Sequence, residues 1–327
     1  MKLKSLFFLL LVLYSCDNEL NVIEDYKDIP VVYGVLSTSD TAQYIRVEKV
    51  FVDPETSALV LAQNPDSLYY NDIDVSIQRE DGAIYQLEKV DANLEGYQRE
   101  EGVFAQSPNY LYKIRTGDIP LVSDNEYTLI LHRVNDVTPV TATTDLVGAS
   151  KILTPSSSIG FNYVQPTRIR WRKGENARIF DIYIQFNYRE RITSSSDDFE
   201  KKSITWNMAT NIPSTSDDIE EFEKVGIDFY SFLVGNLEAD ENIERRADDV
   251  TVILDSGGVE ILELNRLNDA NLGITSSQDI PVYTNLSEGR GIFSSKYTEK
   301  LERIELKAAT LDSLANGVIT KSLNFKI

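Results

Sequence analysis

The stretch IDVSIQREDGAIYQL, residues 73–87, decides the fold of this chain. Apolar Val75 and Ile77 alternate with polar neighbours, and a period of two is typical of a strand that buries one face. Asp81 and Gly82 then supply the positive φ angles of a tight turn before a second short apolar run. Residues 73–87 are therefore predicted to form a β-hairpin.

The same alternation continues on both sides of the hairpin. A short apolar run opens the region at residues 31–36, and strand patterns follow at residues 44–50, 110–115, 126–134 and 140–146. About seven short strands at such spacing are typical of a β-sandwich. We therefore expect an immunoglobulin-like or transthyretin-like domain over residues 30–147.

A connector rich in proline and serine, residues 148–160, marks a predicted domain boundary. Strand patterns resume beyond it, at residues 167–172, 177–188, 203–208, 281–284, 303–308 and 318–327. The sequence thus predicts a second β-sandwich domain over residues 161–327.

One helix is predicted inside this second domain, near residues 217–236. Apolar residues step by three or four from Ile219 to Leu233, as one face of a helix requires. Asp217 as N-cap and Glu220 three residues later form a capping pair. The expected fold class is mainly β, with two β-sandwich domains in tandem and one α-helix inserted in the second.

A further hairpin is expected where Ser256-Gly257-Gly258 separates two apolar runs, residues 250–255 and 259–265. Preceded by Asp255, the same letters resemble the nucleophile phrase of trypsin-like serine proteases. A catalytic triad also needs a histidine base, and His132, the single histidine, lies in an unrelated strand pattern. We therefore interpret the phrase as a turn and expect no enzyme, although a pair of carboxylates for glycoside hydrolysis stays open from sequence alone.

The first residues, MKLKSLFFLLLVLYSC, predict export and lipidation. Residues 1–15 combine a basic start with an apolar run too short to span a bilayer permanently. The run ends in Leu-Tyr-Ser-Cys, which resembles the bacterial lipobox, and Cys16 is the single cysteine of the chain. A lipidated Cys16 would hold the protein on a membrane through residues 16–29 as a tether. The alternatives are an ordinary cleaved signal ending near Cys16 and a buried membrane stub.

The charge of the chain restricts its partners. With 32 basic and 52 acidic residues, the formal net charge is −20, which repels phosphate backbones and argues against nucleic acid. One histidine and one lipidated cysteine do not make a zinc site. The oxygen-rich loops around residues 197–198 and 269–271 lack the spacing of a calcium-binding EF-hand loop. No metal or other cofactor is predicted.

Several stretches resemble a family of Bacteroidota outer-membrane lipoproteins of unknown function, close to the DUF4249 lipoproteins. They are PVVYGVL at 30–36, YIRV at 44–47, AQNPDS at 62–67, FYSFL at 229–233 and YTNLSEGRGIF at 283–293. The resemblance implies β-sandwich domains, placement in the outer membrane and association with large β-barrels, and it supplies no catalytic residues. Asp17 and Glu19, directly after Cys16, resemble the signal that exports such lipoproteins to the cell surface.

Two functions are compatible with these patterns. The first is a non-catalytic interaction subunit of an outer-membrane barrel machine for barrel assembly or TonB-dependent uptake, with Tyr69, Tyr70 and Trp206 as candidate partner contacts. Its partners would be the membrane, through Cys16, a barrel protein and other lipoproteins. The alternative is a module that captures a glycan or peptide for a transporter, for which exposed aromatic side chains are expected.

Overall fold

The computed structural model describes residues 29–50, 56–123, 125–134, 137–193, 198–216, 218–271 and 282–327. The predicted signal peptide, Cys16, Asp17 and Glu19 lie outside these residues. The described chain is mainly β, as predicted, and its strands form three sheets. No helix of the described residues has the length and apolar character needed to cross a membrane.

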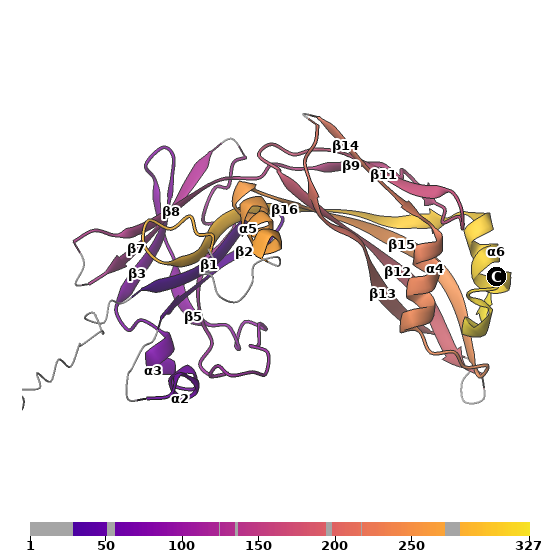
Figure 1. Ribbon diagram of the computed structural model, residues 1–327, viewed down its shortest axis with the longest axis horizontal. Helices are drawn as coiled ribbons and strands as arrows, with labels where there is room; N and C mark the ends of the chain where they lie inside the picture. The colour runs from indigo at the N-terminus through magenta and orange to yellow at the C-terminus, as the bar shows by residue number, and fades with distance from the viewer. Residues whose placement is uncertain are drawn as a thin grey trace, which may run out of the picture.

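The largest sheet has ten strands and runs through both halves of the molecule (Figure 1). Its strands, in spatial order, are β13 (Glu200–Pro213), β12 (Ile179–Ile192), β15 (Ile243–Gly257), β16 (Arg290–Leu306), β1 (Pro30–Ser37), β2 (Ala42–Lys49), β6 (Tyr110–Arg115) and β5 (Glu88–Asp91). Two short strands join it, β10 (Ser158–Ile159) beside β16 and β17 (Phe325–Lys326) beside β15.

Two smaller sheets cover the same side of the large one. The four-stranded sheet has the order β4 (Ile84–Gln86), β3 (Ile73–Arg79), β7 (Glu126–Arg133) and β8 (Val140–Asp145), and the three-stranded sheet has the order β14 (Ile219–Val225), β11 (Pro166–Arg172) and β9 (Lys151–Thr154). The helices are α2 (Ala58–Ala62), α3 (Pro65–Leu68), α4 (Ile227–Asn236), α5 (Val259–Asn271), α6 (Ala308–Asn316) and the 3-10 turn η1 (Lys321–Leu323).

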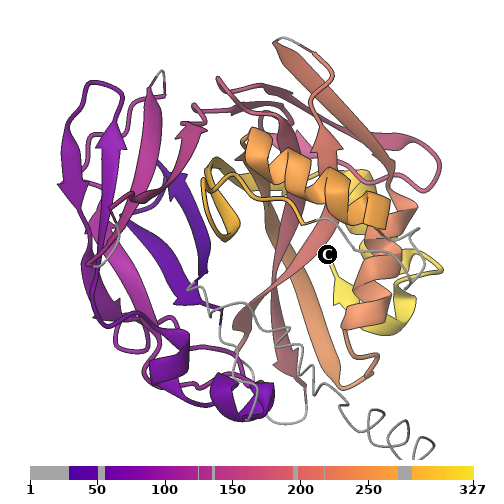
Figure 2. The same cartoon turned by 60° about the vertical axis from the view of Figure 1, so that its left-hand side comes forward.

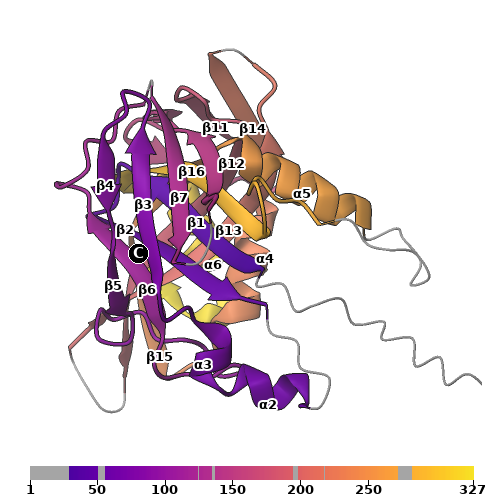
Figure 3. The same ribbon diagram turned by 90° about the vertical axis from the view of Figure 1, so that its left-hand side faces the viewer.

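The first lobe packs β1, β2 and β6 against the four-stranded sheet. Alternation decides which side chains meet: Ile45 and Val47 of β2 point inward and contact the same core as Val75 and Leu129 from the opposite sheet. The predicted hairpin is confirmed, because β3 and β4 pair antiparallel across a turn in which Gly82 has φ +88°. Figure 3 looks onto this lobe, with α2 and α3 at its lower end.

The second lobe packs the other end of the large sheet against α4, α6 and the three-stranded sheet. Phe180, Ile182, Ile184 and Phe186 line the inner face of β12, as their alternation predicts. Trp171 is fully buried against Phe180, and the two rings meet edge to face at 5.1 Å.

Strand β16 joins the two lobes. Its first half pairs in parallel with β1, from Arg290 to Lys296, and its second half pairs antiparallel with β15. As a result Phe293, late in the sequence, is buried in the first core. The predicted connector at 148–160 also contains β9 and β10 rather than being free of strands.

Three sequence predictions in the second lobe are wrong, the last of them the strand at residues 318–327, of which only Phe325–Lys326 form a strand while Lys321–Leu323 form the 3-10 turn η1. Residues 219–225 of the predicted helix form β14, and the helix α4 begins only at Ile227. Glu220 caps no helix; its carboxylate accepts hydrogen bonds from the segment 214–216, while Asp217 lies outside the described residues. Pairing with β11 overrides the helical spacing, since β14 sets its acidic residues opposite the arginines of β11.

The second error concerns residues 259–265, predicted as a strand and found at the start of α5. Short apolar runs of this length do not distinguish a strand from a helix. Ser256 and Gly257 accordingly end β15 instead of forming a hairpin turn, and the helix follows directly. The second lobe therefore has three α-helices among its described residues, not the single inserted helix that was predicted.

Candidate functional site

The face of the ten-stranded sheet that points away from the two cores is covered only in part, by α5 over Ser294, and we call this face the trough. Residues that stand opposite each other on neighbouring strands point to the same face of the sheet. The pairs on the trough face include Tyr33 with Arg46, Val35 with Ser294, and Thr298 with Asp255. The two cores lie on the opposite side of the same sheet. In Figure 2, β1 and β2 lie on one side of the view and the strands of the second lobe on the other, with α5 near the top.

The first-lobe part of the trough holds a hollow of about 760 Å³, which we call the tyrosine hollow. Tyr33, Tyr44 and Tyr97 line it together with Val35 and Leu111. Tyr33 and Tyr97 are 54% and 55% exposed, which is unusual for such large side chains. The rings of Tyr44 and Tyr97 meet at 5.0 Å with a tilt of 60°.

Charged side chains hold these rings in place. The Tyr44 hydroxyl donates to Glu95 at 3.2 Å, and Glu95 also pairs with Lys113. The hydrogen bond from Lys113 lowers the pKa of the Glu95 carboxyl, whereas burial raises the pKa of Tyr44. Arg46 is paired with Glu48 at 3.0 Å. These charges are therefore committed to each other and fix the geometry of the hollow.

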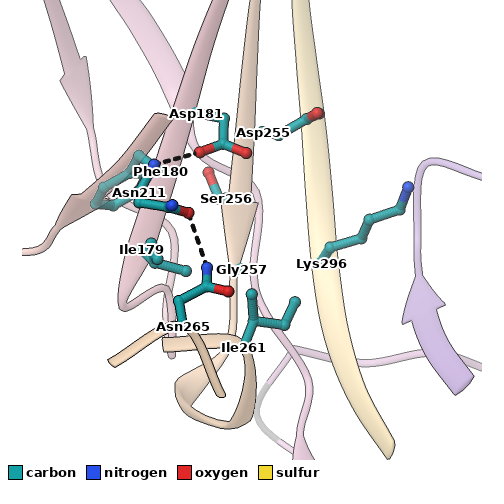
Figure 4. A pocket seen from close by; sticks show the side chains of 10 residues that line it. All are labelled: Ile179, Phe180, Asp181, Asn211, Asp255, Ser256, Gly257, Ile261, Asn265 and Lys296. Atoms are coloured by element: carbon teal, nitrogen blue, oxygen red, sulfur yellow. Dashed lines mark hydrogen bonds between the residues drawn. The ribbon is translucent and has the colours of Figure 1, made fainter. Parts of the chain in front are cut away.

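A smaller hollow of about 140 Å³ lies beside it on β12, β15 and α5, and we call it the acidic pit (Figure 4). Asp181 and Asp255 stand directly opposite each other on adjacent strands. Asp181 accepts the backbone N–H of Asn211 at 2.7 Å, and Asp255 accepts the Thr298 hydroxyl at 2.5 Å. Burial raises the pKa of Asp181, and the Asp255 carboxylate acts in the same direction.

Lys296 connects the two hollows, since it lines both of them. Its side chain points away from Asp181 toward the first lobe (Figure 4). Among the described residues Lys296 makes no ion pair, so its ammonium group is available to a ligand. The trough thus offers exposed rings at one end, carboxylates at the other and one uncommitted cation between them.

The described residues contain no arrangement typical of nucleophilic catalysis. Ser256 is fully buried, and its hydroxyl is 2.7 Å from that of Ser150. His132 lies on β7, in the four-stranded sheet rather than the sheet of Ser256. Within the described ranges, no group of three or more histidine, cysteine or acidic side chains is placed to hold a metal ion.

The three aromatic residues predicted as partner contacts are core residues instead. Tyr69, Tyr70 and Trp206 are 3%, 6% and 5% exposed. Trp206 packs against the stacked rings of Phe161 and Phe229, where its large apolar surface contributes to stability. The exposed aromatic residues of the trough, Tyr33 and Tyr97, were missed. Tyr33 lies in a run, residues 31–36, that is apolar on both faces, so the sequence pattern contains no signal that its side chain is exposed.

Comparison with known proteins gives no family. No protein-family model matches the chain, and no curated protein matches it. Among solved structures, one similar chain is the C-terminal globular domain of an oligosaccharyltransferase from Pyrococcus abyssi, with 9% identity and a TM-score of 0.23. The match covers 68% of this chain and 41% of that one, so the chain spans about two fifths of the structure it matches. A likeness this weak supports no conclusion on fold or function.

Proposed function

We propose that this chain is a non-catalytic binding protein, a surface lipoprotein of the bacterial outer membrane that holds its ligand in the trough. The observation that carries the proposal is the pair of exposed tyrosines, Tyr33 and Tyr97, that line a hollow in the trough. Exposed tyrosines at a concave surface are typical of recognition sites, since a core would have buried them. The two lobes would correspond to the immunoglobulin-like or transthyretin-like modules expected over residues 30–147 and 161–327, except that Leu286 and Phe293 of the second range belong to the core of the first lobe.

Placement at the membrane is supported by the sequence alone. The apolar leader, the lipobox-like ending at Cys16 and the acidic residues Asp17 and Glu19 favour a lipid anchor and export to the surface. The stretches similar to DUF4249-like lipoproteins of Bacteroidota favour the outer membrane. Mass spectrometry of the mature N-terminus tests this part: a diacylated or triacylated Cys16 is expected, and an unmodified thiol would contradict it.

A binding role fits the acidic pit better than catalysis does. Glycoside hydrolysis needs two carboxyl groups that flank the bond to be broken. Asp181 and Asp255 are instead cross-strand neighbours on β12 and β15, so both carboxyl groups lie on the same wall of the pit. Each already accepts a hydrogen bond from the protein, from Asn211 and Thr298 respectively. Such carboxylates are suited to orienting a polar ligand.

A second surface favours docking on an outer-membrane barrel, and we call it the apolar patch. Leu59 and Val60 of α2 are 64% and 60% exposed, and Val103 and Phe104 on the neighbouring loop are also exposed. The two segments are tied together by the hydrogen bond from the Ala105 N–H to the Ala62 carbonyl, 2.8 Å. Exposed apolar groups that cluster often mark protein contacts. The trough would then hold cargo while the apolar patch contacts the barrel.

Photo-crosslinking in intact outer membranes tests both surfaces. A benzoylphenylalanine side chain would replace Tyr33 in the trough, Phe104 in the apolar patch or Val318, which is 96% exposed in the second lobe and belongs to neither surface. We expect a discrete adduct, saccharide or protein, at position 33, a barrel protein at position 104 and background labelling at position 318. Labelling at 33 no stronger than at 318 would contradict the proposed role of the trough.

A further inference from the structure

We propose that the tyrosine hollow binds a neutral oligosaccharide, whose sugar rings stack on Tyr33 and Tyr97 while its chain passes Lys296 toward the acidic pit. The inference rests on the proposed function and names the class of ligand. Four properties of the site support it: the direction in which its backbone groups point, the rigidity of its rings, the balance of its charges, and its size and continuity.

The backbone of the hollow is not available to a ligand. Strand β1 pairs on both edges, with β2 and β16, and β2 pairs on both edges, with β1 and β6. Their N–H and C=O groups therefore lie in the plane of the sheet and are used by neighbouring strands. A peptide bound as an added strand needs a free edge. Recognition in the trough must come from side chains, which favours a ligand without a strand-forming backbone.

The rings of the hollow are held firmly. The loop that carries Tyr97 is fastened by two hydrogen bonds, from the Tyr97 N–H to the Ala92 carbonyl at 2.8 Å and from the Asn109 side-chain amide to the Tyr97 carbonyl at 2.9 Å. Asn109 is itself only 1% exposed. Tyr33 projects from a strand in the interior of the sheet. A ligand that stacks on such rings orders few side chains and loses little conformational entropy.

The charges of the hollow favour a ligand without net charge. Arg46 is paired with Glu48, which Arg99 also contacts, and the chain as a whole carries −20, which repels anionic polymers. Two opposite charges are left without an ion-pair partner among the described residues, Asp40 at the rim and Lys296. A carboxylate and an ammonium group are complementary to hydroxyl groups, which both donate and accept hydrogen bonds. Sugar rings provide such hydroxyls around an apolar face.

The size and continuity of the site favour a chain of sugars over a single one. A hollow of about 760 Å³ lies within the roughly 300–1,000 Å³ common for small-molecule sites. Beyond Lys296 the acidic pit adds Asp255 and Asn265, the amide of which is held by Asn211 at 2.8 Å. The polar end of the trough can therefore accept hydroxyls of the next ring along the chain.

Isothermal titration calorimetry on the full-length chain in detergent micelles tests the inference. The probes are neutral hexasaccharides of α- and β-linked glucose, mannose, xylose and N-acetylglucosamine, with an oligogalacturonate and a neutral decapeptide for comparison. At least one neutral hexasaccharide is expected to bind. For it, Tyr33→Ala and Tyr97→Ala should each weaken binding at least tenfold, while Tyr33→Phe, which keeps the ring face, stays within about threefold.

Ile84→Ala serves as the matched control, because Ile84 is 62% exposed on the four-stranded sheet, outside the trough. Every variant should keep the wild-type unfolding midpoint, so that a loss of binding reports a lost contact. The inference is overturned if no neutral hexasaccharide binds, if the peptide or the oligogalacturonate binds instead, or if Tyr33→Ala binds as well as Ile84→Ala. Protein adducts at position 33 alongside failed sugar binding would overturn this inference alone and leave the proposed function standing.

Discussion

The junction between β16 and β1 depends on a glycine, and replacing it should destabilise the chain severely. Gly291 has φ +98°, and a Cβ at this position would lie 1.9 Å from the carbonyl oxygen of Val32. Gly82 in the β3–β4 turn has a similar φ of +88°, with nothing within 4 Å of a Cβ. The pair separates two costs, because Gly82→Ala adds only backbone strain and Gly291→Ala adds a steric overlap as well.

The magnitudes follow from this difference. A residue with a side chain at positive φ costs roughly 1–2 kcal/mol. Forcing extra atoms into a packed site costs roughly 1–3 kcal/mol more, and the cost grows when the obstacle is backbone that belongs to a paired strand. We expect Gly291→Ala to lose about 3–5 kcal/mol of unfolding free energy and Gly82→Ala about 1–2 kcal/mol.

Urea unfolding followed by far-ultraviolet circular dichroism measures both variants against the wild type. The free energy of unfolding of Gly291→Ala should fall clearly further than that of Gly82→Ala, by about 1 kcal/mol or more. Equal losses would refute the reasoning, because they would mean that β16 can shift away from Val32 at no cost.

Three other outcomes are expected. Trp206→Ala should lose about 3–5 kcal/mol of unfolding free energy, measured by urea titration, because the ring is buried. A loss below about 1 kcal/mol would contradict its assignment to the core and favour the predicted role as a surface contact. Glu260 is buried, accepts hydrogen bonds from Thr144 and Ser294, and has a carboxyl pKa that burial raises. The free energy of unfolding is therefore highest below the ordinary pKa of 4.5, where the carboxyl is neutral in both states, and it falls as the pH rises through the raised pKa of the folded protein. Glu260→Gln should therefore gain stability relative to wild type between pH 5 and pH 8 in urea unfolding, and a constant difference would contradict this. Burial also raises the pKa of Tyr112 to about 12. In an ultraviolet titration of the tyrosines, Tyr112→Phe should therefore remove absorbance that develops at the alkaline end of the curve and leave the part near the ordinary tyrosine pKa unchanged.

Alternation in the sequence was sufficient to predict the strands that bury one face. The hairpin at residues 73–87 and the inner face of β12 follow from local periodicity and turn chemistry, and both are found. The errors occur where the pattern is too short or fits two structures. Residues 219–225 have helical spacing, yet their acidic side chains pair across strands with the arginines of β11.

The trough could not be predicted from the sequence, since it depends on which strands become neighbours. Tyr33 and Asp255 belong to one surface only because β16 pairs with β1 on one edge and with β15 on the other. Burial of Tyr69 and exposure of Tyr97 likewise depend on packing by distant segments. Residue type alone does not distinguish a tyrosine of the core from one at the surface.

The position of β16 in the chain also sets an order of events during folding. The first lobe cannot be completed by its own residues, because a strand near the C-terminus supplies Phe293 to its core. The Thr298 N–H that bonds to the Ser39 hydroxyl comes from 259 residues later in the chain. Contacts so distant in sequence form slowly. Until β16 reaches β1, the first lobe has an open sheet edge, and open edges of this kind are prone to aggregation during folding.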